Sequence, residues 1–148
     1  MLEKMKRFVR EMDLCVLATV SEGKPHCSLM AYVVDDECQE IYMTTLRHTT
    51  KFRNLTENPM VSILIDNREG YSGSLRSEAK AMTVAGRYSR LENLDKISLI
   101  RKNLLARHPH LEKFLGHPDA EILCIKISSF LLLNGLAEAH FEELPAQR

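Results

Sequence analysis

The spacing of apolar residues near the N-terminus predicts a helix followed by a β-hairpin. Apolar residues recur at intervals of three and four, with charged residues between them, at Leu2, Met5, Val9 and Met12. This is the pattern of a helix that buries one face. Residues 14–20 then form an apolar run rich in strand-forming residues. Ser21-Glu22-Gly23-Lys24 follows with the composition of a tight hairpin turn.

The same pattern predicts five more strands, at residues 26–34, 40–45, 60–66, 80–88 and 121–133. Two helical segments interrupt them. Residues 48–58 read as a short helix that Pro59 ends, and residues 92–108 read as a longer helix, with a second short helix up to Leu115. Gly86, inside a strand, predicts a bulge or a close backbone approach. The polar segment 67–78 is long for a hairpin connection, which indicates a functional or mobile loop.

Many strands with few, segregated helices predict a mainly β (α+β) fold. We expect a six-stranded antiparallel split β-barrel with an N-terminal helix, a short helix between strands three and four, and a helical segment before the last strand. The length of 148 residues suits one domain over residues 1–148.

The composition limits the kinds of partner that we expect the protein to bind. Twenty basic and twenty acidic residues cancel, so the basic excess of a nucleic-acid-binding protein is absent. No apolar run reaches the roughly 18 residues of a membrane span, and the charged N-terminus lacks the apolar centre of a signal peptide. We therefore expect a cytoplasmic protein that binds neither nucleic acid nor membrane.

The strongest candidate for chemistry is the segment Thr44–Lys51 (TTLRHTTK), which joins a predicted strand to a predicted helix. The first N–H groups of a helix lack internal partners and carry partial positive charge, which suits a phosphate. Threonine hydroxyls and the cations Arg47 and Lys51 would add donors. The same residues would also suit an ordinary N-cap followed by a solvated face. The pattern alone leaves both interpretations open.

Other chemistry is not supported. Gly70-Tyr71-Ser72-Gly73-Ser74 does not fit the nucleophile motif of serine hydrolases, and neither a dinucleotide nor a nucleotide-triphosphate glycine motif occurs. His108, His110 and His117 lack cysteines or paired carboxylates at ligand spacing, so we expect no metal.

Three stretches, together with the order of the elements, resemble the FMN-binding split barrels related to pyridoxamine 5′-phosphate oxidase. They are Leu14–Val34 with Gly-Lys-Pro at its turn, Ile41–Ile65 with an Asn-Pro pair after its helix, and Thr83–Leu91. The resemblance covers residues 2–91 well and residues 121–139 loosely.

The resemblance implies a homodimer with FMN at its interface. It places the flavin ring against the backbone of Ser28, Leu29 and Met30. The ribityl chain and phosphate would be held at the end of the third strand and the turn after it, by Met43, Thr44, Thr45, Thr50 and Lys51, with Arg47 and His48 as further candidates.

The chain also departs from the family pattern. Family oxidases have an arginine where this chain has Ser28, and a tryptophan-bearing C-terminal segment, whereas this chain has no tryptophan. The resemblance therefore implies a small member that is not a genuine pyridoxamine phosphate oxidase. We expect an FMN-dependent oxidoreductase acting on an unidentified small molecule or electron donor, with no residue standing out as catalytic. A non-catalytic FMN-binding, haem-binding or electron-transfer protein, or a barrel that serves as an interaction domain without cofactor, remain alternatives.

Overall fold

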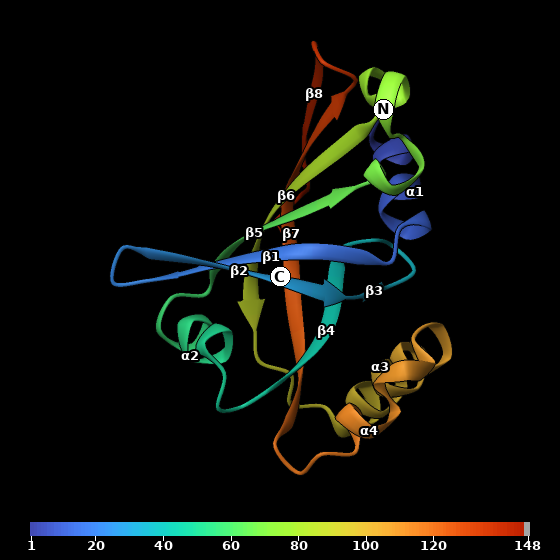
Figure 1. Cartoon of the computed structure of the whole chain (residues 1–148). Helices are drawn as coiled ribbons and strands as arrows, with labels where there is room; N and C mark the ends of the chain where they lie inside the picture. Colours follow the sequence, from blue (N-terminus) through green and yellow to red (C-terminus); the bar gives the residue numbers. More distant parts are fainter. Residues whose placement is uncertain (147–148) are drawn as a thin grey trace.

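The computed structural model describes residues 1–146, and it confirms the predicted fold class, a mostly antiparallel split barrel with helices (Figure 1). Eight strands form one sheet, two more than the sequence predicts. They are β1 (Leu14–Ser21), β2 (Lys24–Ala31), β3 (Val33–Val34), β4 (Glu40–Leu46), β5 (Met60–Asp66), β6 (Lys80–Ser89), β7 (Ala120–Asn134) and β8 (Glu138–Glu143). The α-helices are α1 (Leu2–Glu11), α2 (Thr50–Glu57), α3 (Leu94–Arg107) and α4 (Glu112–Leu115). Short 3₁₀ helices are η1 (Arg68–Gly70), η2 (Gly73–Glu78) and η3 (Pro109–Leu111).

The strand order is β2-β1-β5-β6-β7-β4-β3, and β8 also pairs with β7. The strands β2 and β3 lie at the two ends of this path, yet only Tyr32 separates them in the chain. The sheet therefore curls back on itself. Tyr32 is fully buried and its hydroxyl donates to the carbonyl of Val9 in α1, which fixes the corner. This corner divides the predicted strand 26–34 into β2 and β3.

The barrel interior holds the larger apolar core, to which α1 contributes Met5, Phe8 and Val9. A second cluster lies between the outer side of β4 and β7 and the helices α3 and α4. The strand β4 is buried on both faces, because Met43 points into the barrel and Tyr42 points towards α3. The junction after β4 therefore starts from a rigid strand.

A polar contact fixes α3 over β4. The ammonium of Lys96 lies 3.0 Å from Glu40 Oε2, which also accepts from the Tyr42 hydroxyl at 2.6 Å. Burial acts to raise the pKa of Glu40, but hydrogen bonds from Tyr42, Lys96 and Cys124 outweigh it and leave that pKa below its ordinary value. These titratable side chains are thus used in packing.

The predicted irregularity at Gly86 is confirmed. The register between β6 and β7 shifts between Ala85 and Gly86. A Cβ on Gly86 would lie 2.7 Å from Ile125 Cγ2 and 2.8 Å from the carbonyl oxygen of Lys126. Glycine is required here because β7 passes too close for any side chain.

Within the described residues, no helix is long and apolar enough to cross a membrane.

Candidate cofactor-binding site

Thr49 organises the start of α2. Its hydroxyl oxygen accepts from the Phe52 N–H at 3.3 Å and donates to the Leu46 carbonyl at 2.9 Å. The Thr45 hydroxyl lies 3.1 Å away and donates to it in turn. Thr49 is the N-cap and satisfies the third amide of the helix. The N–H groups of Thr50 and Lys51 have no partner within residues 1–146, so they are free to bind an anion.

Lys51 lies on the inner side of α2. Asn54 and Leu55, three and four residues further on, are the buried residues of this helix, so Lys51 shares their face. Its side chain is half-buried, and burial lowers its pKa below the ordinary value. Its ammonium has no hydrogen bond or ion pair with any residue of the described chain. A desolvated cation without a counter-ion is costly unless an anion binds there.

The strand β2 offers a free backbone edge. The hairpin turn has Glu22 at φ 52° and Gly23 at φ 74°, and the pairing with β1 continues to a bond from the Tyr32 N–H to the Asp13 carbonyl at 3.1 Å. Backbone groups alternate along an antiparallel strand, so even-numbered residues of β2 face β1. Cys27 and Leu29 direct their N–H and C=O groups away from it, where no described strand pairs.

The predicted ring-binding residues therefore differ in what they offer. Leu29 presents a free N–H and C=O, whereas the backbone groups of Ser28 and Met30 face β1. The side chain of Met30 is buried in the barrel core, and that of Ser28 is half-buried.

The predicted phosphate-binding residues divide into two groups. Thr50 and Lys51 lie at the open end of α2. Thr44 and Thr45 are buried, and the Thr44 hydroxyl donates to the Glu121 carbonyl at 3.0 Å. Met43 is fully buried in the barrel core. The hydroxyls of the predicted cluster therefore serve mainly to shape the turn.

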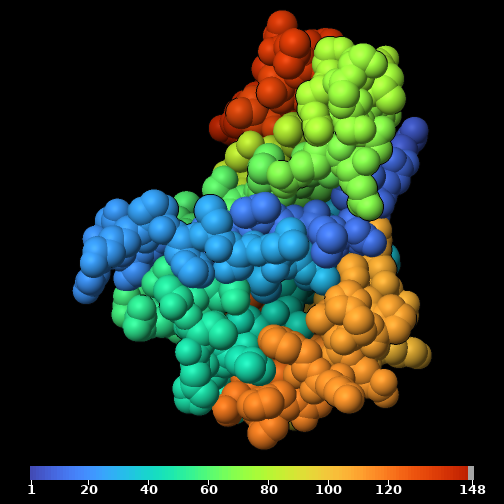
Figure 2. Space-filling view, in the orientation of Figure 1, coloured from blue at the N-terminus to red at the C-terminus, as the bar shows by residue number. Residues whose placement is uncertain are grey.

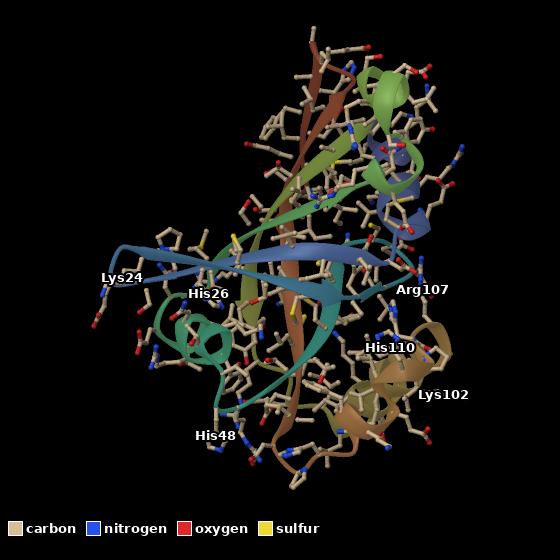
Figure 3. All side chains as sticks on the ribbon, viewed as in Figure 1. Lys24, His26, His48, Lys102, Arg107 and His110 are labelled. Carbon is tan, nitrogen blue, oxygen red and sulfur yellow. The ribbon has the colours of Figure 1, made fainter. Side chains whose placement is uncertain are left out.

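Arg47 and His48 point towards the α4–β7 turn. Arg47 lies 3.1 Å from both Asp119 and Glu121 and donates to the Pro118 carbonyl, while His48 lies 3.3 Å from Asp119. The hydrogen bond from Arg47 lowers the pKa of Asp119 below its ordinary value. Figure 3 shows His48 on the opposite side of α2 from His26. The side chains of Arg47 and His48 therefore lie away from β2.

Sequence reasoning missed a cleft of about 410 Å³ between the β1–β2 hairpin and α2, which includes His26 and Arg53. Figure 2 shows this hairpin projecting beyond the body of the molecule. The spacing of three residues between Thr50 and Arg53, which places both on one helix face, was the sequence signal that could have indicated this cleft.

Among residues 1–146 no three metal-ligating side chains lie close enough to hold an ion.

Solved structures share this fold. A haem-binding protein from Mycobacterium smegmatis superposes with a TM-score of 0.83 at 19% identity, over 95% of this chain and 57% of that one. HutZ, the haem storage protein of Vibrio cholerae, gives 0.72 at 21% identity, over 90% and 93%. A FAD-binding protein from Mesorhizobium loti gives 0.70 at 21% identity, over 89% and 93%.

The chain thus spans little more than half of the mycobacterial protein and nearly all of the other two. Likeness at this level of identity shows a common fold. No curated protein matches the sequence. The sequence itself matches the pyridoxamine 5′-phosphate oxidase family over residues 1–134, most of its length. On that match, the chain belongs to the pyridoxamine 5′-phosphate oxidase family.

Proposed function

We propose that the chain is an FMN-binding flavoprotein that acts as an oxidoreductase. The observation that carries the proposal is the half-buried, unpaired ammonium of Lys51 beside the free N–H groups of Thr50 and Lys51. Together with the Thr50 hydroxyl, these donors fit a phosphate monoester. In this proposal Thr44, Thr45 and Thr49 hold the turn in place, and Arg47 and His48 brace it against Asp119.

The flavin ring fits the free edge of β2. The pyrimidine end of a flavin carries both a hydrogen-bond donor and acceptors, and the free backbone N–H and C=O of Leu29 match them. The helix α2 packs against β1 and β2, so phosphate and ring sites lie on neighbouring elements. When bound, the flavin supplies hydride or electron transfer, while the chain binds and orients it.

An exposed apolar face supports the proposed homodimer. Cross-strand partners on the outer side of the sheet form a continuous row from β2 to β8: Leu29, Val16, Leu64, Thr83, Leu131 and Phe141. Leu29 is 72% exposed and Phe141 is 58% exposed. Contiguous apolar surface of this kind marks an association site. Because Leu29 belongs both to this row and to the free edge of β2, a partner seated on the row would cover the ring site.

The test is the colour of the purified protein and its titration with FMN. We expect absorbance near 450 nm and about one FMN per chain, as for other flavoproteins. Reduction of the bound flavin by NADH or NADPH would support the oxidoreductase role. Bound flavin that neither nucleotide reduces would favour an electron-transfer or carrier protein. A colourless protein that takes up no added FMN would refute flavin binding and leave an interaction domain.

Haem binding is the second candidate. Two structural neighbours are named as haem-binding or haem-storing proteins, and His26 lies beside the free edge of β2 with no hydrogen bond to its ring in the described chain. Added haemin should then give a Soret band that a His26→Ala variant loses. If FMN binds and haemin gives no such band, this candidate is excluded.

A further inference from the structure

The cleft between α2 and the β1–β2 hairpin begins next to the proposed phosphate site. The helix contributes one wall, a single face of α2 formed by Thr50, Arg53, Asn54 and Glu57. Thr50 is therefore shared between the cleft and the phosphate site. The wall runs from Thr50 to Glu57, a length of about 10 Å at 1.5 Å per residue. A ligand held by its phosphate at Lys51 could continue along this wall.

Two contacts hold the cleft open at a fixed width. In its floor the Asn54 amide donates to the Thr19 hydroxyl at 3.1 Å, and both side chains are buried. Thr19 lies in β1 and pairs with His26 of β2, so this contact anchors α2 to the hairpin. At the outer end the Ser21 hydroxyl donates to the Glu57 carboxylate. The cleft is thus a built feature with walls from two elements.

Its charges change sign along its length. The inner end carries Arg53, His26 and the Thr50 hydroxyl, while the outer end carries Glu57 and Glu22 together with Lys24. In the described chain the side chains of Arg53, His26 and Lys24 have no hydrogen bond or ion pair. Figure 3 shows His26 directly above α2 and Lys24 at the projecting end of the hairpin. The inner end therefore offers unused donors, and the outer end offers carboxylate acceptors.

We propose that this cleft binds the nucleotide part of a flavin dinucleotide, beyond the phosphate held at Lys51. The second phosphate would lie between His26 and Arg53, whose side-chain donors are unused. The ribose that follows is neutral and rich in hydroxyl donors, which suits the free carboxylate oxygen of Glu57. The order of charge in the cleft matches the order of groups in such a ligand. This inference rests on the proposed flavin site.

The test compares riboflavin, FMN and FAD, which carry no, one and two phosphates, by calorimetric titration. We expect FAD to bind at least as tightly as FMN. Arg53→Gln should weaken FAD binding at least tenfold and leave FMN binding within twofold. Arg90→Gln is the matched control, because Arg90 is exposed, unpaired in the described chain, and lines a different cleft, beside Phe52 and Tyr88. It should change neither affinity.

Failure of the inference is separable from failure of the flavin site. FMN binding with FAD more than tenfold weaker would show that the cleft rejects the nucleotide. Equal losses for FMN and FAD in Arg53→Gln would assign Arg53 to the first phosphate, which also overturns the inference. Absence of binding by all three flavins would overturn the flavin site itself. Arg53 is exposed, so an unchanged unfolding temperature is expected for the variant.

Discussion

At the scale of single residues, Thr49 explains why a cluster of hydroxyls leaves so few donors for a ligand. The chain has four threonines from Thr44 to Thr50, and the hydroxyls of Thr44, Thr45 and Thr49 are used within the protein. Of these four threonines, only Thr50 has a hydroxyl without a partner in the described structure. From sequence, all four look equally available, because the Glu121 carbonyl that accepts from Thr44 lies 77 residues away.

The same limit applies to Arg47. Its partners Asp119 and Glu121 belong to the α4–β7 turn and β7, more than 70 residues further along the chain. Local sequence shows a cation near a helix start and cannot show that distant carboxylates already neutralise it. Lys51 could be placed from sequence, because its position follows from the helix period and from the family resemblance, both of which are local.

Lys51 gives a prediction about pH. Burial lowers its pKa in the free protein below 10.5, and only the charged form attracts phosphate. The affinity for FMN relative to riboflavin should therefore be highest at neutral pH and fall as pH rises, beginning below the ordinary lysine value. Binding titrations with FMN and with riboflavin, from pH 7 to pH 10, measure this ratio of affinities. Deprotonation of the flavin ring affects both ligands alike, so it cancels in the ratio.

Replacing Lys51 with alanine should weaken FMN binding about tenfold to a hundredfold, or roughly 1.5–3 kcal/mol, and abolish the pH dependence of the ratio. Lys51→Met is the control for packing, because it keeps most of the apolar stem. Both variants should bind riboflavin normally. Unchanged FMN affinity in both would place the phosphate elsewhere.

At the scale of elements, hydrophobic periodicity predicted most strands well. The strand β5 matches its predicted bounds, and β1 and β4 each extend one residue further. The strand β8 was missed because Glu138–Glu143 is mostly charged and small, and only pairing with β7 makes it a strand. The corner at Tyr32 was missed because the apolar pattern continues through it, while the tertiary bond to Val9 fixes the bend.

The bulge at Gly86 gives a prediction about stability. Gly86→Ala would press a methyl group against the Lys126 backbone, which belongs to the central strand β7 and cannot move freely. We expect a loss of about 1–3 kcal/mol in the free energy of unfolding, measured by chemical denaturation. Gly70→Ala is the control, since a Cβ there meets nothing within 4 Å, and should cost less than about 0.5 kcal/mol. Equal effects would mean that the close approach is not what constrains position 86.

At the scale of the whole molecule, the exposed row of cross-strand partners from Leu29 to Phe141 predicts that the protein is a dimer. Leu131→Glu places a charge within the row, between Thr83 and Phe141. We expect it to convert a dimer of twice 17.0 kDa into a 17.0 kDa monomer, as measured by light scattering after gel filtration. FMN should then bind more weakly, because the partner no longer covers the ring site.

Leu94→Glu is the matched control. Leu94 is 77% exposed at the start of α3, outside the row. This variant should remain dimeric and bind FMN normally. A monomeric parent protein, or a Leu131→Glu variant that stays dimeric, would show that the row is not the dimer interface.

The position of β7 also governs the order in which the molecule can be completed during synthesis. This strand pairs with β6 along one edge and with β4 and then β8 along the other. Until residues 120–126 of β7 have left the ribosome, β4 has only the two-residue β3 as its partner. Its core residues Ile41 and Met43 would stay exposed to solvent for that time. The nascent chain can therefore assemble β2-β1-β5-β6 first, and it closes its barrel only after β7 has been synthesised.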